Sequence, residues 1–371
     1  MKKYYLIFLV SLFPIFIACT DKRESHFVNV DEIYAFDSGQ IDTTLSTTIE
    51  RIDFLALQAD VNSDVYEVDK MVLKNDLIFI GDFHAAKIVV YDLNGKVKFV
   101  LDKRGAGPQE YLELKSFAVD DYNIYILDNY RHIINVYDCR TGIYKQSMKL
   151  PFVAWDMEIL DNNHFIFAFV PLEGGQLNMK QPPYKVWITD KELQITKMYF
   201  QYGKDEYEFV GKSTYFVSVQ DGIVFNSMSS DDFTIFFTED SVKRIGIDFS
   251  NAIPDKYRKE RKKIFEDGYS YISQTPIVSK NKYIVFEFSV GDNLISYIYD
   301  KNMGRFYSNA YIDSYNYLFQ PKATYQDKLV CYLDNYSLYE ELVESGFARA
   351  DSTVEQHLKN EGGILMFYTM Q

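Results

Sequence analysis

Short apolar runs separated by polar turns recur along the chain, and they predict β-hairpins rather than helices. In each hairpin an apolar run is followed by a turn of Asn, Asp, Gly, Lys or Gln residues and then by a second apolar run. Aromatic residues make up 17% of the chain, which also favours strands. Six such hairpins stand at residues 72–80, 118–127, 158–167, 217–225, 276–286 and 324–331.

A third strand follows each hairpin, and a fourth follows most of them. The third strands end alike, and the terminal residues Asp92, Asp138 and Asp190 lie 46 and 52 residues apart. A four-stranded unit of about 45 residues repeated around a ring is the signature of a β-propeller blade. Because the chain ends after the sixth third strand, we expect the strand at 49–57 to complete the last blade. The predicted fold is an all-β, six-bladed propeller over residues 45–371.

Two segments interrupt this rhythm and predict short helical insertions. The first, at about 253–267, lies between blades 4 and 5, and Pro254 suits its first turn. Its basic run would suit an anionic partner or lipid headgroups, but a solvated face paired with local carboxylates is the favoured interpretation. The second, at about 338–360, lies inside blade 6. A capping box starting at Ser352 begins one of its turns, and we expect the insertion to pack over one face of the propeller.

The N-terminal residues predict export. Met1-Lys2-Lys3 precedes an apolar stretch from Tyr4 to Ile17 that is too short for an ordinary membrane span. The sequence Phe16-Ile17-Ala18-Cys19 resembles the lipobox of bacterial lipoproteins, although Phe16 stands where Leu is preferred. This resemblance implies a signal peptide at 1–18, a lipid on Cys19, a tether at 19–44 and an outer-membrane location in a Gram-negative bacterium, with either side of that membrane open. The alternatives are an ordinary signal peptide cleaved near Ala18, or a chance cysteine.

Charge and cysteine content narrow the set of partners. The chain carries a formal net charge of −14, and removal of Lys2 and Lys3 with the signal peptide makes it more negative. Such a surface repels a polyphosphate backbone, so nucleic acid is not an expected partner. Besides Cys19 there are only Cys139 and Cys331, which give no disulfide framework and no zinc cluster. Whether those two cysteines pair stays open, and we expect a monomer.

A glycine-rich stretch, Gly105-Ala106-Gly107-Pro108, connects the first two predicted blades. A phosphate-binding loop needs a Lys-Ser/Thr pair or a following helix, and here neither is present. We therefore interpret the stretch as a corner in which Gly105 and Gly107 supply positive φ angles and Pro108 adds stiffness. A degenerate copy runs from Gly203 to Tyr207, so that the Glu-Tyr pairs at 110–111 and 206–207 lie two blades apart.

This connector and the strands after it resemble an NHL-type propeller repeat. The resemblance rests on residues 105–111, 117–120, 124–128, 133–138 and Thr141-Gly142. Together with the lipobox, the pattern is similar to the six-bladed β-propeller lipoproteins of Bacteroidota, which are mostly of unknown function. The strongest matches cover about residues 66–150, and the later blades match by strand rhythm alone. The resemblance implies a fold and an envelope location, and it implies no reaction.

Polar residues gather in the segments that a propeller brings to one face, namely the connectors between blades and the loops between second and third strands. Concave rims of this kind bind ligands in many proteins. The aspartates that follow second strands would suit a ring of metal ligands, but tight turns use the same residues, and we favour the turn. The predicted ligand face comprises Arg104, Glu110, Tyr111, Asp82, His84, Asp128, Arg131, His132, Glu206 and Tyr207, with Asp205, Asp334 and Asn335 nearby.

Two functions fit these observations. The first, which we favour, is a lipid-anchored binding module for a small molecule, glycan, peptide or envelope protein. The second is a metal-dependent hydrolase or lyase of the lactonase kind, with calcium or zinc at the central channel, which related propellers suggest. His84 and His132 lie on adjacent blades, but zinc would need a third ligand. A channel lined by apolar, Lys or Arg side chains would count against the second function. No nucleophile elbow or His-Glu-x-x-His motif is present, and no cofactor is predicted.

Overall fold

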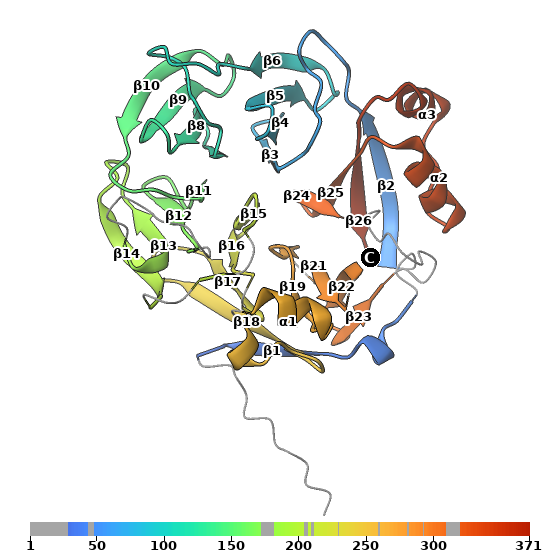
Figure 1. Ribbon diagram of the computed structural model, residues 1–371. Coiled ribbons are helices and arrows are strands. Elements are labelled where there is room, and N and C mark those ends of the chain that lie inside the picture. Colours follow the sequence, from blue (N-terminus) through green and yellow to red (C-terminus); the bar gives the residue numbers. More distant parts are fainter. Residues whose placement is uncertain are drawn as a thin grey trace, which may run out of the picture.

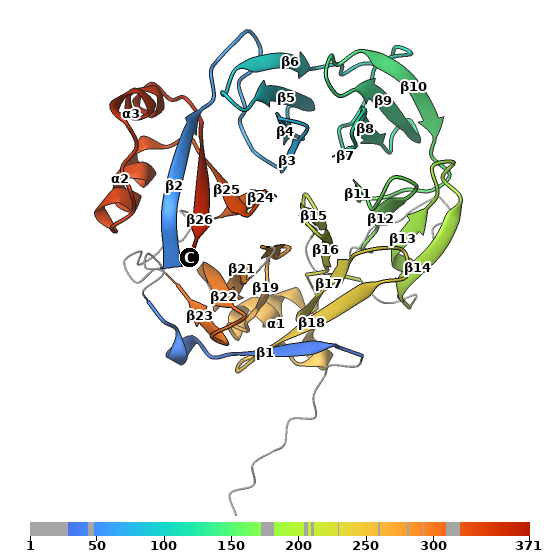
Figure 2. The same cartoon turned by 180° about the vertical axis from the view of Figure 1, so that it is seen from behind.

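Six antiparallel sheets stand as blades around a central axis, as predicted (Figures 1 and 2). The computed structural model describes residues 29–43, 48–171, 182–203, 207–208, 211–228, 230–258, 260–279, 282–291, 293–308 and 320–371. The predicted signal peptide, Cys19, the first part of the predicted tether, Asp205 and Glu206 lie outside these residues. No helix within the described ranges has the length and apolar character needed to cross a membrane.

The blades follow one another along the chain, with the inner strand first in each. Blade 1 holds β3 (Lys70–Lys74), β4 (Leu77–Asp82), β5 (Lys87–Asp92) and β6 (Val97–Leu101). Blade 2 holds β7 (Ser116–Val119), β8 (Asn123–Asp128), β9 (Ile133–Asp138) and β10 (Tyr144–Lys149). Blade 3 holds β11 (Asp156–Ile159), β12 (Phe165–Ala168), β13 (Tyr184–Thr189) and β14 (Ile195–Gln201).

The second half of the ring carries the departures from a plain four-stranded blade. Blade 4 holds β15 (Phe216–Val219), β16 (Gly222–Asn226), β17 (Asp232–Phe236) and β18 (Val242–Phe249). Blade 5 has a divided inner strand, β19 (Tyr271–Ile272) and β20 (Ile277–Val278), followed by β21 (Tyr283–Val290), β22 (Asn293–Asp300) and β23 (Arg305–Tyr307). Blade 6 holds β24 (Pro321–Tyr325), β25 (Lys328–Leu333) and β26 (Ile364–Met370).

The apolar core is divided among the six junctions between neighbouring blades. Along β4, Phe79 packs into the cluster shared with blade 2, while Ile78 and Ile80 pack into the cluster shared with blade 6. A strand whose two faces both contact neighbouring blades is apolar at every position, which explains the unbroken run Leu77-Ile78-Phe79-Ile80. The turn before this strand is tight, because Asn75 and Asp76 adopt φ angles of 55° and 59°.

The two ends of the chain close the ring, as predicted. Strand β2 (Ile49–Ala56) pairs antiparallel with β26 and supplies the outer strand of blade 6. The preceding residues also belong to the fold: β1 (Glu32–Phe36) pairs parallel with β18, and Asp42 bridges to Tyr307 of blade 5. Residues 29–43 and 48–56 therefore form a strap along the outer edges of blades 4, 5 and 6. The predicted boundary between tether and propeller at residue 44 is therefore wrong, because residues 32–36 and Asp42 pair with strands of the blades.

Aromatic packing explains why the strap is held. Tyr34 and Phe36 are the buried positions of β1. The Phe36 ring makes edge-to-face contacts with the rings of Phe249, Phe288, Tyr297 and Phe306, at centroid distances of 4.8–5.5 Å. The sequence analysis missed this strand because five residues that alternate in exposure give a weak signal next to a polar segment.

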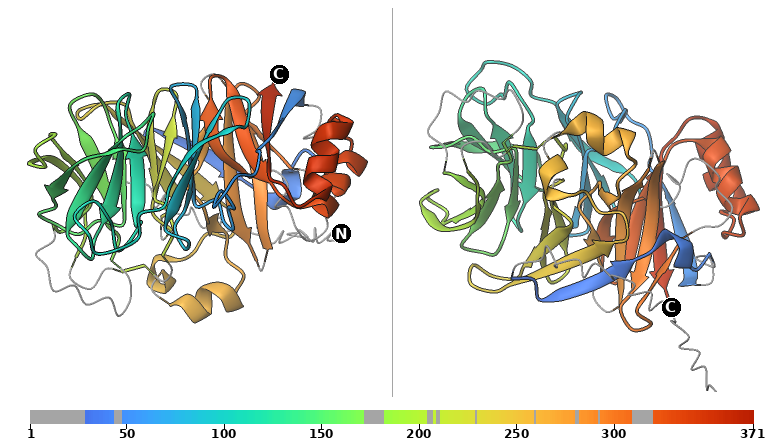
Figure 3. Two further views of the ribbon diagram at one scale, coloured as in Figure 1. Left: turned by 90° about the horizontal axis from the view of Figure 1, so that it is seen from above. Right: turned by 60° about the horizontal axis from the view of Figure 1, so that its bottom comes forward.

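Both helical insertions exist, with corrected details. The first contains η3 (Asp255–Tyr257) and α1 (Arg261–Glu266), which project from one face of the ring (Figure 3). The second contains α2 (Tyr336–Glu344) and α3 (Ser352–Lys359). It flanks the outer side of β2 at the rim instead of covering a face, because its buried side chains join the core shared with blade 6 (Figures 1 and 3). Asp351, not Ser352, caps α3 by accepting hydrogen bonds from the backbone N–H groups of Thr353 and Val354.

Candidate functional site

The ring has two faces that differ in the segments they expose. The connectors between blades and the loops between second and third strands lie on what we call the connector face. The turns between first and second strands, and between third and fourth strands, lie on the hairpin face. The predicted ligand face is the connector face.

Asp82 and Asp128 perform the same structural task in adjacent blades. One carboxylate oxygen of Asp82 accepts a hydrogen bond from the Ala85 N–H (2.8 Å), and the other accepts from the Tyr66 N–H (2.9 Å). Asp128 accepts in the same way from the Arg131 N–H (3.0 Å) and the Leu112 N–H (2.7 Å). Both side chains are fully buried. Each aspartate therefore closes its own turn and fastens the incoming connector, which confirms the turn interpretation for these two residues.

The glycine connector is a corner, but not for the predicted reason. Neither Gly105 nor Gly107 has a positive φ angle. A Cβ atom at Gly105 would lie 2.1 Å from Glu110 Oε2, and one at Gly107 would lie 2.9 Å from the same atom. That oxygen accepts a hydrogen bond from the Gly107 N–H (2.7 Å). A side chain at either position would displace the Glu110 carboxylate, which folds back onto the loop, from its hydrogen bond with the Gly107 N–H.

Arg131 of blade 2 and the buried side chain of Tyr111 hold this corner in place. The Arg131 guanidinium donates to the carbonyl oxygens of Gly107 and Glu110. The Tyr111 hydroxyl is buried within hydrogen-bond distance of the Ala86 and Leu101 carbonyl oxygens (2.8 and 3.0 Å). The polar groups of this conspicuous motif are thus used to satisfy backbone atoms.

The other described residues of the predicted face differ in their surroundings. His84 and Arg104 are exposed, and Tyr207 is half-buried. The backbone of His132 is left-handed, with φ of 53°, and so is that of Ala86. His132 is therefore the counterpart of Ala86 in the neighbouring blade, and not of His84. Asp334 is exposed, and Asn335 caps α2 by accepting from the Leu338 N–H. Within the described ranges, no group of three His, Cys, Asp or Glu side chains is arranged to hold a metal ion.

A polar cluster that the sequence analysis missed lies at the axis of the ring, among the inner strands. Lys70 Nζ lies 3.2 Å from Asp156 Oδ1 and 2.8 Å from Glu158 Oε1, and it donates to the Met157 carbonyl oxygen (2.9 Å). The Ser116 hydroxyl donates to Asp156 Oδ1 (2.5 Å). All four side chains are buried. We call Lys70, Ser116, Asp156 and Glu158 the axial cluster.

The axial cluster joins four blades. Asp156 Oδ2 accepts hydrogen bonds from the backbone N–H groups of Tyr215 and Phe216 in blade 4, at 2.7 and 2.8 Å. Lys70 comes from blade 1, Ser116 from blade 2, and the two carboxylates from blade 3. Lys70, Ser116 and Asp156 are each the first residue of an inner strand, and this equivalence was the signal that could have found them. The aligned positions carry no recognisable motif, so the pattern is visible only once the blades are superposed.

Burial and charge shift the protonation of the axial cluster. Burial alone would lower the pKa of Lys70, but the charges of Asp156 and Glu158 raise it above its ordinary value. Burial raises the pKa of Glu158, and Lys70 opposes this shift. The cluster therefore contains one ammonium group, that of Lys70, for the two acidic side chains of Asp156 and Glu158. The Lys70 ammonium group lies between the two carboxylates. It occupies the place at the axis where the metal hypothesis would need side chains that converge on an ion.

A wide cavity opens from the axial cluster toward the hairpin face. Its volume is about 660 Å³, within the range of small-molecule sites. Glu158 lies among its lining residues, and the hairpin turns of blades 1, 3, 4 and 6 form its rim. The rim includes Asn75, Leu160, Asp221 and Gln326. A narrow cavity of about 180 Å³ lies at the connector end and is lined by residues that include Glu67, Ser213, Thr275, Glu287 and Lys322.

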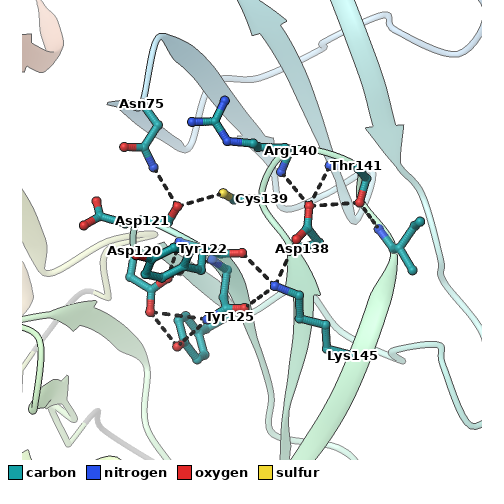
Figure 4. A network of polar contacts seen from close by, with 12 residues as sticks. Asn75, Asp120, Asp121, Tyr122, Tyr125, Asp138, Cys139, Arg140, Thr141 and Lys145 are labelled. Atoms are coloured by element: carbon teal, nitrogen blue, oxygen red, sulfur yellow. Dashed lines mark hydrogen bonds and ion pairs between the residues drawn. The ribbon is translucent and has the colours of Figure 1, made fainter.

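Part of the rim of the wide cavity is fixed by a polar network between blades 1 and 2 (Figure 4). The Asn75 side-chain amide donates to the Asp121 carbonyl oxygen (3.1 Å), and Lys74 Nζ lies 3.4 Å from Asp121 Oδ1. Lys145 donates to the Tyr122 carbonyl oxygen (3.0 Å) and pairs with Asp138 (3.0 Å). The contacts of Asn75 and Lys74 with Asp121 hold the hairpin turn of blade 1, which lines the cavity, against blade 2, whereas both contacts of Lys145 lie within blade 2.

Comparisons with known proteins agree with this architecture. Residues 27–364 match the family described as Domain of unknown function (DUF4934). No curated protein matches the chain. The chain is similar to the crystal structure of a protein of Bacteroides fragilis NCTC 9343 named as exported, with 18% identity and a TM-score of 0.70 over 91% of this chain and 99% of that one. A DUF4221 member from Bacteroides vulgatus ATCC 8482 is 11% identical, with a TM-score of 0.51 over 87% of this chain and 97% of that one. At these identities the likeness shows the fold alone.

Proposed function

The chain belongs to the DUF4934 family, and we propose that it is a lipid-anchored binding module of the bacterial envelope whose ligand enters the wide cavity on the hairpin face. The observation that carries this proposal is the cavity itself, which is of small-molecule size and reaches the buried Glu158 of the axial cluster. A concave site of this size can bury much of the surface of a small ligand.

The polar residues of the connector face argue for this choice between the two faces. Asp82, Asp128, Glu110 and Arg131 already hold backbone groups of their own connectors, so their hydrogen-bonding capacity is largely used. The wide cavity instead presents side chains from five blades around one volume. Ligand binding by side chains gathered from several elements is the usual arrangement of a pre-formed pocket.

The binding proposal is tested by thermal unfolding of the mature chain in a library of mono- and disaccharides, short peptides and small metabolites. A ligand at 100 times its Kd stabilises the folded protein by about 2.7 kcal/mol, which raises Tm by several degrees. Two matched variants locate the site. Gln220→Trp places a large side chain at the rim of the wide cavity, and His84→Trp places one on the connector face.

We expect Gln220→Trp to weaken binding at least tenfold and His84→Trp to leave it unchanged. The opposite result would move the site to the connector face, and a library without any stabilising compound would count against a small-molecule function.

The anchor is proposed separately, from the sequence of residues 1–19. The apolar stretch followed by Ala18-Cys19 supports lipidation of Cys19. Metabolic labelling with a radioactive fatty acid in a Bacteroidota host should label the wild-type chain and not Cys19→Ala. Equal labelling of both chains, or labelling of neither, would refute the lipid anchor and leave the binding proposal untouched.

A further inference from the structure

The floor of the wide cavity has more negative than positive charge. Lys70 is the cation shared by Asp156 and Glu158, and Glu158 is the member of the axial cluster that also lines the cavity. Asp221 adds a second carboxylate at the rim, and the ammonium group of Lys74, the one Lys or Arg among the lining residues, is paired with Asp121. A buried carboxylate without a full counter-charge is costly, so a cation that reaches Glu158 would be stabilised strongly.

The rest of the lining suits a hydroxylated ligand. Ser218, which hydrogen-bonds the Glu158 side chain, and Thr324 bring hydroxyl groups to the lining, and Gln220 and Gln326 bring amides. Two aromatic side chains, Phe237 and Tyr325, lie among the same lining residues, and 38% of Phe237 is exposed. Aromatic faces beside hydroxyl and amide groups bind the apolar face and the hydroxyl groups of a sugar ring together.

We propose that the wide cavity binds an amino sugar, a small saccharide with a free amino group whose ammonium lies against the Glu158 carboxylate. This inference rests on the proposed function, because it names the ligand class of the same cavity. A charge-assisted hydrogen bond from the ammonium group to Glu158 would complete the charge balance of the axial cluster. The sugar hydroxyls would bond to the polar lining nearer the rim.

Isothermal titration calorimetry of the mature chain with two sugars tests the inference. Glucosamine and N-acetylglucosamine share a ring and differ in the charge at one nitrogen. At pH 7 we expect glucosamine to bind at least tenfold more tightly. The Glu158→Gln variant should bind the two sugars equally, because it removes the carboxylate and retains the shape. Glu344→Gln, an exposed substitution on α2 at the outer rim, removes one carboxylate far from the cavity and should keep the preference.

The outcomes separate this inference from the proposed function. Equal affinities in the wild type, or a preference for N-acetylglucosamine, would overturn the amino-sugar inference and leave a binding cavity in place. If neither sugar binds, the inference also fails, and the compound library alone decides the proposed function. If Glu158→Gln does not fold, Asp221→Asn at the rim takes its place. A preference reduced at least threefold in that variant supports the inference, and an unchanged preference overturns it.

Discussion

The glycine connector and the axial cluster are both polar, but they use their polar groups differently. In the connector, Glu110, Asp128 and Arg131 bond to backbone N–H and carbonyl groups within one junction between two blades. In the axial cluster, the Lys70 ammonium group bonds to both Asp156 and Glu158, so one cationic side chain serves two acidic ones. The connector is a finished structural joint, whereas the axial cluster borders a cavity with an electrostatic imbalance.

This contrast shows why a conspicuous motif is a poor guide to a site in a repeat fold. The connector motif is contiguous in the sequence because a single corner needs all of its residues. The axial cluster draws its residues from three inner strands, whose first residues lie 40 to 86 positions apart. A site at a propeller axis is assembled by the ring, so no short stretch of sequence carries it.

The largest expected effect comes from removing the shared cation. Lys70→Met leaves Asp156 and Glu158 buried without a counter-charge, and we expect the free energy of unfolding at pH 7 to fall by about 3–5 kcal/mol. The loss should shrink as the pH falls, because burial raises the pKa of Glu158 and that carboxylate takes up a proton. Denaturant unfolding measures both values, with Lys74→Met at the exposed rim as the control. A loss no larger than that of the control would show that the axial cluster has no counter-charge role.

An intermediate effect is expected at the connector. Gly105→Ala places a Cβ against the Glu110 carboxylate, which must move away and lose its hydrogen bond from the Gly107 N–H, so we expect a cost of about 0.5–1.5 kcal/mol. In a Glu110→Ala background the same substitution should cost almost nothing. A double-mutant cycle from denaturant unfolding gives the coupling between the two positions. Strictly additive costs would mean that another constraint, and not the folded-back carboxylate, selects glycine here.

A smaller effect is expected when the surplus charge is removed. Because burial raises the pKa of Glu158 in the folded state, its contribution to stability is greatest below its unfolded value of 4.5 and is lost as the pH rises toward the folded value. Glu158→Gln should abolish this dependence and leave stability at pH 7 unchanged, or higher by about 1 kcal/mol. Unfolding measured from pH 4 to 8 checks the slope. A marked loss at pH 7 would mean that Lys70 requires both carboxylates.

The smallest effect is expected in the exposed network between blades 1 and 2. A hydrogen bond from Lys145 lowers the pKa of Asp138 to about 2, so its contribution is present above its ordinary value of 3.8 and is lost as the pH falls through about 2. Because the pair is partly exposed, Asp138→Asn should cost only about 0.2–1 kcal/mol at pH 7. Added salt should reduce this cost further. A cost equal to that of Lys70→Met would contradict the expectation that an exposed charge pair at the rim stabilises the fold less than the buried axial cluster does.

The repeat could be predicted from the sequence because each blade carries its own hairpin signal and its own apolar strands. Ring closure by residues 49–56 followed from a missing outer strand. The rest of the strap did not, since β1 owes its place to Phe36 contacting rings that are distant in the sequence. Gly105 and Gly107 were assigned to the correct corner for the wrong reason, because the position of the Glu110 carboxylate is a three-dimensional fact. The axial cluster was missed because its members are single polar residues at the starts of apolar strands.

A crystal structure of the mature chain soaked with glucosamine tests the central claim most directly. The account predicts the sugar in the wide cavity on the hairpin face, with its ammonium nitrogen within ion-pair distance of the Glu158 carboxylate and its ring among the residues of the rim. Sugar bound on the connector face, or a wide cavity that stays free of sugar at saturating concentration, would contradict it.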